Sequence, residues 1–536
     1  MKNKCFGIMR AKRARSFYRA AFRPTTDPVS AGSVRRFLRF WREARQMSGF
    51  CFSKTNFLKG EKLMNQKLDK FFKITERGSN IRTEIMAGLT TFFAMAYIIV
   101  TNPNQVTGFM QGPDFGTIWN AVYVASILVA VVGTLLCALY AKMPFAQACG
   151  MGLNSFFFVS FVLPAFLAGG DVVQGYREGL TIILLEGILF LILSATGVRG
   201  LLAKALPENL KKAIPAGIGL FIAFIGFKNV GIIQANQYTF VQFFDFHGAI
   251  TGKTFMEGWR AIAPVVLALL GLLAMAILGK KNVKGNVILT ILGVSVLYYL
   301  TTWTAPEFDM SSIGQSFKDF GKIGIFGAFK GFTVFEGGFS AVVNAIVLTL
   351  TFCLVDMFDT IGTLYGTASQ ANMMDENGDP INMNQCMVAD AVATVTGGVL
   401  GTSTCTTFVE SAAGVGAGGR TGLASVVTAF CFLLCLFLTP LALIIPACAT
   451  APALIYVGVL MLRNFAKVNM DDIAEAVPAF LALIMMPLTY SISNGIAIGC
   501  FAHVVISLVT GKYSKKEIPV TVIAVLFLLR FFLVSM

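Results

Sequence analysis

The sequence has little charge. Asp, Glu, Lys and Arg make up 13% of its 536 residues, and 56% of the residues are hydrophobic. A soluble globular domain has about a quarter of its residues charged, and its core could not bury this much apolar surface. The composition therefore excludes a soluble protein and predicts a chain that crosses a membrane many times in segments of about 20 residues. The long apolar runs favour helices, because the strands of a membrane barrel alternate in hydrophobicity.

Histidine is nearly absent, and cysteine shows no informative spacing. The two histidines are His247 and His503, and the eleven cysteines follow no metal-ligand pattern. Zinc sites and Cys/His nucleophile sites need such clusters. We expect His503 to pack near the end of a helix rather than to relay protons. The sequence therefore gives no support for an enzyme, a bound metal or another cofactor.

Acidic residues are scarce at the start of the chain. Residues 1–63 hold sixteen Lys and Arg against three acids. Because this charge precedes the first apolar segment, it indicates a cytoplasmic basic tail near anionic lipid rather than a nucleic-acid partner. Two alternatives stay open for this extension. It is an arginine-rich targeting segment, or translation begins at Met64 and the extension is not part of the native protein.

The rest of the chain is a series of apolar segments. Fourteen of them are expected to form membrane elements, and one more apolar segment follows. They lie at residues 83–101, 119–141, 145–166, 178–197, 210–232, 261–279, 285–303, 338–368, 386–400, 402–416, 421–444, 450–465, 474–489 and 492–510, with the last at 518–535. Lys and Arg gather in alternate connections, which places those connections and the N-terminus in the cytoplasm.

The two halves of this series resemble each other. A glycine-rich, interrupted segment comes third in each half, and "AIPAGIGLFIAFIGFKNVG" (213–231) is similar to "IIPACATAPALIYVGVLMLRNF" (444–465). The similar segments are seven elements apart, and since seven is odd, the two repeats have opposite topology. The sequence thus predicts an all-α polytopic membrane protein of two inverted seven-helix repeats, an arrangement typical of secondary transporters.

This pattern divides the chain into six parts. They are a basic extension (1–63), an amphipathic cytoplasmic lead-in (64–82), the first repeat (83–303), an extracytoplasmic loop (304–337), the second repeat (338–510), and a basic loop with an apolar helix (511–536).

Three of the apolar segments carry polar groups that suggest a site. "GMGLNSFFF" (150–158) contains Asn154, which can donate and accept, among glycines that permit an extended turn. Glycine packing at a helix crossing, with Asn154 bonding between helices, is the structural alternative.

"LVDMFDTIGTLYG" (354–366) places Asp356 and Asp359 three residues apart on one helical face. Burial and mutual repulsion favour the protonated form of at least one of them, which suits proton coupling. A helix end in water is the alternative.

The third such segment is "GTSTCTTFVESAAG" (401–414). Its β-branched, hydroxyl-rich first part is a poor helix former, so we expect a short extended piece followed by a half-helix. Glu410 would then lie near the membrane midplane, close to Asn154, and an acid at that depth is functional by default. A Glu410–Arg420 ion pair is the alternative. Two other acids, Glu186 and Asp390, are more easily explained by helix pairing or capping.

Five stretches of the chain resemble the AzgA-like purine permeases, the adenine/guanine/hypoxanthine branch of the nucleobase–ascorbate (nucleobase:cation symporter-2) transporters. They are "TEIMAGLTTFFAMAYIIVTNP" (83–103), "GMGLNSFF" (150–157), "VDMFDTIGTLYG" (355–366), "GTSTCTTFVESAAGVGAGGRTGL" (401–423) and "MPLTYSISNGIAIG" (486–499). The resemblance covers residues 75–536 in order. The sequence departs from the family pattern at Gln147-Ala148-Cys149, at Ser155-Phe156 and at Cys405, which leaves the preferred base open.

The resemblance implies a uracil-permease-like fold in which spans 1–4 and 8–11 form a core domain and spans 5–7 and 12–14 a gate domain. It also implies that the base lies between the third, eighth and tenth spans. The site residues carried over by motif are Gly152, Asn154, Asp356, Asp359 and Glu410, with Thr407 and Phe408 as neighbours in the tenth span. Glu410 is expected to be the main base ligand, Asp356 a second ligand or proton acceptor, and Asp359 a proton-coupling residue.

The chemistry of a purine fits such a site. One carboxylate can accept two hydrogen bonds from the edge of the base, and an amide can match a carbonyl/N–H pair. Phe156, Phe158 or Phe408 could stack on the ring. The expected function is proton-coupled import of purine nucleobases across the cell membrane, with a homodimer possible. The alternatives are another nucleobase, uracil or xanthine, and an uncoupled channel.

Overall fold

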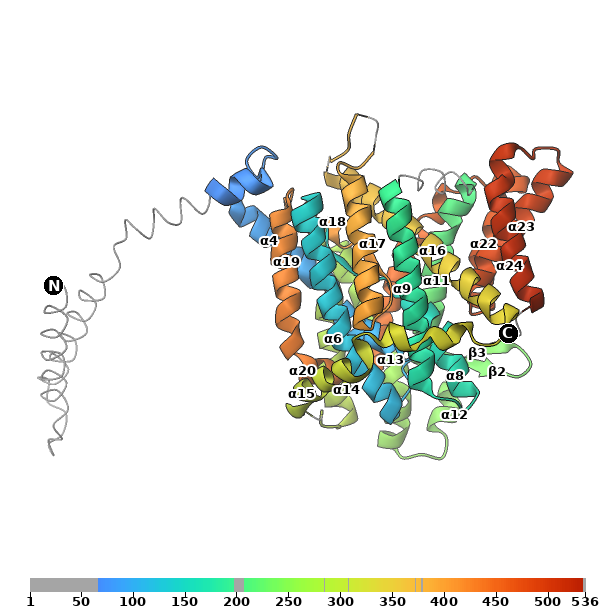
Figure 1. Cartoon of the computed structure of the whole chain (residues 1–536). Helices are drawn as coiled ribbons and strands as arrows, with labels where there is room; N and C mark the ends of the chain where they lie inside the picture. The colour runs from blue at the N-terminus through green and yellow to red at the C-terminus, as the bar shows by residue number, and fades with distance from the viewer. Residues whose placement is uncertain are drawn as a thin grey trace, which may run out of the picture. The chain divides into compact units, whose positions relative to one another are not determined.

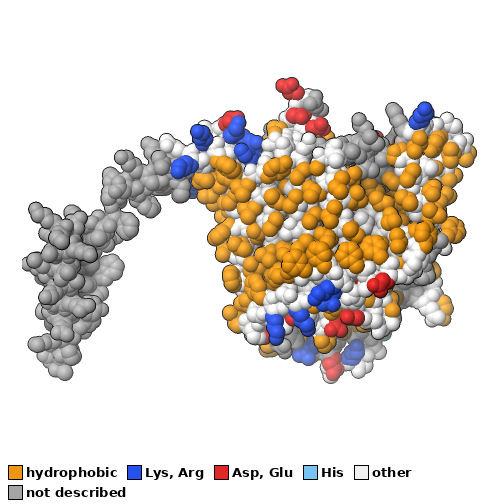
Figure 2. All heavy atoms as spheres, in the orientation of Figure 1, with side chains coloured by type: hydrophobic (Ala, Val, Ile, Leu, Met, Phe, Trp, Pro, Cys, Tyr) orange, Lys and Arg blue, Asp and Glu red, His pale blue; other side chains and the backbone are white. Residues whose placement is uncertain are grey.

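The computed structural model describes residues 66–196, 207–283, 285–306, 308–371, 373–376 and 379–533. The predicted basic extension (1–63) lies outside the described residues. Eight helices of the described part are long and apolar enough to cross a membrane, and five more apolar helices are shorter. Figure 2 shows hydrophobic side chains in a continuous band across the visible face, with charged side chains above and below it. The chain is a polytopic helical membrane protein, as predicted.

The helices and strands follow the predicted order (Figure 1). Those of the first half are α4 (Ile81–Met95), α5 (Ile98–Val106), α6 (Pro113–Leu136), β1 (Gln147–Cys149), α7 (Met151–Phe157), α8 (Leu163–Leu167), α9 (Val172–Thr196), α11 (Glu208–Asn229), β2 (Ile233–Asn236), β3 (Phe240–Phe243), α12 (Phe246–Ile250), α13 (Phe255–Lys280) and α14 (Asn286–Thr302). Two π-helical turns, η1 (Cys137–Ala141) and η2 (Phe158–Val162), follow α6 and α7.

The second half begins with α15 (Ser311–Asp319) and the long α16 (Phe339–Ala371). It continues with α17 (Met383–Leu400), β4 (Cys405–Thr407), α18 (Ser411–Gly416), α19 (Gly422–Leu434), α20 (Thr439–Leu443), α21 (Ala447–Leu462), α22 (Ile473–Leu488), α23 (Ile492–Val509) and α24 (Ile518–Leu533). Residues 489–491 form a tight connection between α22 and α23. The count of fourteen membrane elements stays a prediction.

The two interrupted segments are built alike, as predicted. In each, a three-residue strand precedes a short helix: β1 precedes α7, and β4 precedes α18. The strands pair antiparallel with Gln147 opposite Thr407 and Cys149 opposite Cys405. This pairing satisfies backbone groups that would otherwise be unbonded within the membrane. The chain enters β4 through Gly401, whose φ of +101° favours glycine.

The helices pack in two groups around these strands. In one group, α9 and α6 pack against α17, and α4 and α6 against α19; α16 contacts α9 and α18. In the other, α11 packs against α21 and α22, α22 against α23, and α13 against α14 and α21. The groups meet where α11 contacts α7 and α16, and where α14 contacts α4. The interrupted segments therefore lie in the first group and face the second through α7.

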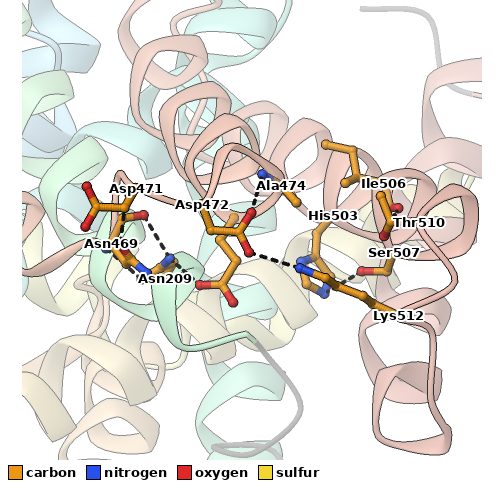
Figure 3. Close-up of polar contacts among 11 residues, drawn as sticks. Asn209, Asn469, Asp471, Asp472, Ala474, His503, Ile506, Ser507, Thr510 and Lys512 are labelled. Atoms are coloured by element: carbon orange, nitrogen blue, oxygen red, sulfur yellow. Dashed lines mark hydrogen bonds and ion pairs between the residues drawn. The ribbon is translucent and has the colours of Figure 1, made fainter.

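A polar cluster joins the beginnings of α11 and α22 to the end of α23 (Figure 3). Asn209 donates to Glu475 Oε2 at 2.6 Å, and its Oδ1 accepts the N–H of Asn469 at 3.1 Å. Asp472 caps α22 by accepting the N–H of Ala474, and Lys512 donates to its other oxygen at 3.0 Å. These bonds fix one end of the second group of helices.

Much of the connection at 304–337 is helical, which the sequence did not predict, and its place outside the cytoplasm stays a prediction. α15 lies against α6, where Asn120 donates to Asp319 Oδ2 at 2.8 Å and accepts from Ser316 at 3.1 Å. These part-buried polar contacts were not visible in the sequence, since they join residues about 200 positions apart. The β2–β3 hairpin was also not predicted, and α24 packs against α23 and α16.

Candidate functional site

The predicted site residues come from β1–α7, from β4–α18 and from the middle of α16. α16 contacts β4, α18 and α7, so the three segments that carried polar groups in the sequence do meet. Their side chains, however, lie in different environments. Glu410 and Asp359 are half-buried, whereas Asn154, Asp356, Thr407 and Phe408 are buried.

Glu410 directly precedes α18 and is held by a tyrosine. The Tyr97 hydroxyl donates to Glu410 Oε1 at 2.6 Å, and the Tyr97 side chain is 1% exposed. Tyr97 lies at the break between α4 and α5. The predicted alternative partner, Arg420, does not bond to Glu410. Its guanidinium donates to the carbonyl oxygens of Val415 and Gly419, both at 2.7 Å. One oxygen of Glu410 thus has a fixed donor, and the other can accept from a ligand.

The two aspartates of α16 are separated by the packing. Asp359 is close enough to Glu410 for a direct electrostatic interaction, and it receives no hydrogen bond from the described residues. Asp356 is 0% exposed and accepts from Thr394 on α17 at 3.2 Å through Oδ2, while its Oδ1 has no partner. Asp359 is therefore a half-buried acid on the helix that contacts α18, which Glu410 directly precedes, and Asp356 lies in the buried layer between α16 and α17.

Asn154 lies in a buried amide network and makes no hydrogen bond to Glu410. Its Nδ2 donates to Gln105 Oε1 at 3.2 Å, and its Oδ1 accepts from the Ser403 hydroxyl. Next to it, Asn102 donates to Thr402 at 3.0 Å. The network joins α5 to both interrupted segments. The Nε2 of Gln105 has no partner, so the network retains a free donor.

The remaining predicted residues have structural contacts. Thr407 accepts from Gln147 Nε2 at 3.3 Å across the strand pair. The Phe408 N–H donates to the Ala146 carbonyl at 3.0 Å and extends that pairing. Gly152 faces the second group of helices, because a Cβ placed on it would lie 2.3 Å from Cγ2 of Ile218 on α11. The absence of a side chain at Gly152 thus allows α7 and α11 to touch.

The aromatic side chains proposed for stacking lie close to the site but are packed. Phe156 contacts Phe352 with ring centroids 4.9 Å apart and is 1% exposed. Phe158 and Phe408 are 7% and 6% exposed. A base could stack on any of these rings only after a small movement of α7 or β4.

Sequence reasoning missed Tyr97, Gln105 and Asn102. The run "TNPNQ" (101–105) was a usable signal, because amide side chains three apart inside an apolar helix share one face. Tyr97 gave no such signal. A lone tyrosine in an apolar helix is common, and only the break between α4 and α5 turns its hydroxyl toward Glu410.

The comparisons with known proteins show the family of the chain. The sequence model of the Permease family (Xan_ur_permease) matches residues 82–498. The chain belongs to this family. Adenine permease AdeP of Escherichia coli is 36% identical to this permease over 470 residues, which cover 86% of this chain and 95% of the relative. Guanine/hypoxanthine permease PbuO of Bacillus subtilis is 37% identical over 464 residues, which cover 86% and 100%. The predicted resemblance to AzgA-like permeases is confirmed, and these relatives are transporters, not enzymes.

Solved structures support the fold of the permease. The transmembrane domain of the cyanobacterial bicarbonate transporter BicA superposes with a TM-score of 0.53, covering 77% of this chain and 97% of that one. The two sequences are 15% identical, so this likeness concerns the fold alone. The predicted fold class is confirmed.

Proposed function

We propose that this permease imports purine nucleobases together with protons. The observation that carries the proposal is the pair of half-buried carboxylates, Glu410 and Asp359, beside the interrupted tenth segment. Relatives that match nearly the whole chain are adenine and guanine/hypoxanthine permeases. The N–H groups along a purine edge need acceptors, and carboxylates are the strongest acceptors that side chains offer.

Glu410 is the proposed main ligand of the base. Tyr97 holds Oε1, which leaves Oε2 and the second lone pair of Oε1 for ring and exocyclic N–H groups. Asp359 is the proposed second acidic group of the site. Asn154 and Gln105 would read the opposite edge of the base if the free Nε2 of Gln105 turns toward it. A buried hydrogen bond left unmade costs about 1–3 kcal/mol, which is enough to select among bases.

Proton coupling follows from the cost of burying acids. An isolated carboxylate in an apolar layer is expensive, so buried acids are paired or neutral. Asp356 has no cationic partner among the described residues and one oxygen without any partner. We propose that it holds a proton, while Asp359 takes part in proton coupling as the base binds.

Transport would move the first group of helices, the core, against the second group, the gate. α7 meets α11 at Gly152 and Ile218, so a displacement there would expose the interrupted segments to one side of the membrane and then to the other. This is the alternating-access scheme expected of inverted repeats. We also propose a location in the cell membrane with a cytoplasmic N-terminus, contact of basic segments with anionic lipid, and a homodimer.

The test is uptake of labelled adenine, guanine and hypoxanthine by cells that lack their own purine permeases. The proposal requires concentrative uptake of at least one of them and its loss when a protonophore is added. If the cells took up only uracil or xanthine, that base and not adenine, guanine or hypoxanthine would be the substrate. Uptake that ignores the protonophore and only equilibrates the base would indicate a channel.

A further inference from the structure

Two buried acids on α16 and α17 occur in the same local pattern. Each is followed four residues later by a threonine: Asp356 by Thr360 in "DMFDT", and Asp390 by Thr394 in "DAVAT". Residues four apart lie on one face of a helix. All four side chains are 0% exposed, and α16 packs against α17. Two Asp–Thr faces therefore meet inside the core.

Their hydrogen bonds cross from one helix to the other. Thr394 of α17 donates to Asp356 of α16 at 3.2 Å. Thr360 of α16 donates to Asp390 of α17. Each threonine thus serves the acid of the neighbouring helix, and we call these four residues the crossed Asp–Thr pairs.

Both threonines also contact strand β4. Thr394 Oγ1 accepts the N–H of Cys405 at 3.0 Å and lies 3.0 Å from the carbonyl oxygen of the same residue. The hydroxyl oxygens of Thr360 and Thr406 are 2.8 Å apart. β4 leads directly into Phe408 and Glu410. The crossed Asp–Thr pairs are therefore one hydrogen bond away from the strand that carries the proposed base ligand.

Counting hydrogens favours a proton on Asp356. The single hydroxyl hydrogen of Thr394 cannot serve fully both the Cys405 carbonyl and an ionised Asp356. If Asp356 carries a proton, it donates to Thr394, and Thr394 donates to Cys405. The two lone pairs of the Thr394 oxygen then accept from Asp356 and from the Cys405 N–H, so the hydroxyl of Thr394 and both backbone groups of Cys405 are satisfied.

The same count gives two valid arrangements at Asp390. With Asp390 ionised, Thr406 donates to Thr360, and Thr360 donates to Asp390. With Asp390 protonated, Asp390 donates to Thr360, and Thr360 donates to Thr406. Protonation of Asp390 thus reverses the direction of a hydrogen-bond chain that ends on β4.

The surroundings of Asp390 contain acids and thiols but no cation. Five titratable groups on neighbouring elements interact electrostatically with Asp390. They are Glu186 of α9, Asp356 and Asp359 of α16, Cys137 of η1 and Cys405 of β4. No Lys, Arg or His among the described residues forms an ion pair with them. Oδ1 of Asp356, Oδ1 of Asp390 and both oxygens of Glu186 are buried without a partner.

These orphaned oxygens point to protons as the ligand. No group of three acids, His or Cys among the described residues is arranged to hold a metal ion. Three unpaired buried charges would be prohibitively costly, whereas neutral carboxyls are not. The layer therefore needs bound protons to be stable.

We propose that the crossed Asp–Thr pairs are the binding site of the transported proton, with Asp390 as the group that gains and loses it and Asp356 as a permanently protonated partner. The inference rests on the proton coupling proposed above. When a proton binds Asp390, the Thr360 hydroxyl turns from Asp390 to Thr406. Thr406 of β4 then accepts a hydrogen bond from Thr360 instead of donating one to it. Proton binding and base binding at Glu410 are linked in this way through one short strand.

The test uses purified full-length protein in proteoliposomes, with a purine that the wild type transports. A pH gradient of one unit is imposed while K⁺ and valinomycin hold the membrane potential at zero. For one proton per base, the wild type should accumulate the base about tenfold, since each pH unit is a factor of ten. Asp390→Asn keeps the shape and is permanently neutral, so it should equilibrate the base without accumulating it and should retain exchange of preloaded base.

Asp471→Asn, at an exposed acid outside the core, is the matched control and should accumulate the base like the wild type. Tenfold accumulation by Asp390→Asn would overturn the inference. If Asp390→Asn shows no exchange, Thr360→Val and Thr360→Ser decide. The inference is supported if Thr360→Val, which lacks the hydroxyl, fails to accumulate the base and Thr360→Ser, which keeps it, accumulates the base normally. Normal accumulation by Thr360→Val overturns the inference. A wild type that never responds to the pH gradient would instead refute the proposed coupling itself.

Discussion

Replacing Tyr97 by phenylalanine isolates the best-defined polar contact of the site. The change removes the hydroxyl that donates to Glu410 at 2.6 Å and keeps the aromatic ring, which is 1% exposed. A hydrogen bond to a charged group is worth about 1.5–3 kcal/mol. Because Glu410 is half-buried and water can replace part of the bond, the lower end applies. We therefore expect the KM for the transported purine to rise about tenfold.

The assay is the initial rate of labelled purine uptake across a range of concentrations, normalised to the amount of protein in the membrane. Tyr123→Phe is the matched control, because Tyr123 is equally buried and its hydroxyl donates to the Cys435 carbonyl at 2.7 Å, outside the site. The control should leave the KM unchanged. An unchanged KM in Tyr97→Phe, or an equal rise in both variants, would refute the assignment of Tyr97 as the residue that positions Glu410.

Three further predictions test other parts of the structure. Glu410→Gln should abolish uptake while the protein still reaches the membrane, because an amide cannot accept through both of its terminal atoms; normal uptake would remove Glu410 from the base site. Gly152→Ala should destabilise the protein by about 1–3 kcal/mol through overpacking against Ile218, and a second change, Ile218→Ala, should restore its thermal stability and uptake. Hydrogen bonds from Lys512 and from the Ala474 N–H lower the pKa of Asp472. Its contribution to stability is therefore present above the unfolded pKa of about 3.9 and is lost as the pH falls through the folded value. The difference in thermal midpoint between wild type and Asp472→Asn should accordingly shrink on acidification, and a constant difference would argue against the ionised pair.

The sequence predicted the interrupted segments well because local chemistry decides them. Thr402, Thr404 and Thr406 disfavour helix, and Gly401 provides the turn into β4. The antiparallel pairing of β1 with β4 was not predicted, and its physical reason is that two extended pieces at the same depth must satisfy each other's backbone groups. The short helices within the connection at 304–337 were not predicted, because their packing depends on distant contacts to Asn120 on α6.

The site was predicted less completely, because burial of a side chain is a property of its neighbours. Asn154 was found as a polar residue in an apolar run, but its partners Gln105 and Ser403 come from elements far apart in the chain. Tyr97 could not be found in this way. Its importance comes from a hydroxyl position that depends on the break between α4 and α5.

The two aspartates of α16 show the limit most clearly. A spacing of three residues places Asp356 and Asp359 on the same side of a helix, but about 60° apart around its axis. On a helix that contacts both α17 and α18, this angle is enough to turn one carboxyl into a dry layer beside Thr394 and the other toward Glu410. The pattern that suggested one shared proton site therefore supports two linked sites. We assign Asp359 to the proposed base site and Asp356 to the proposed proton site with Asp390, whose matching Asp–Thr pattern on α17 gains meaning only from the packing of the two helices.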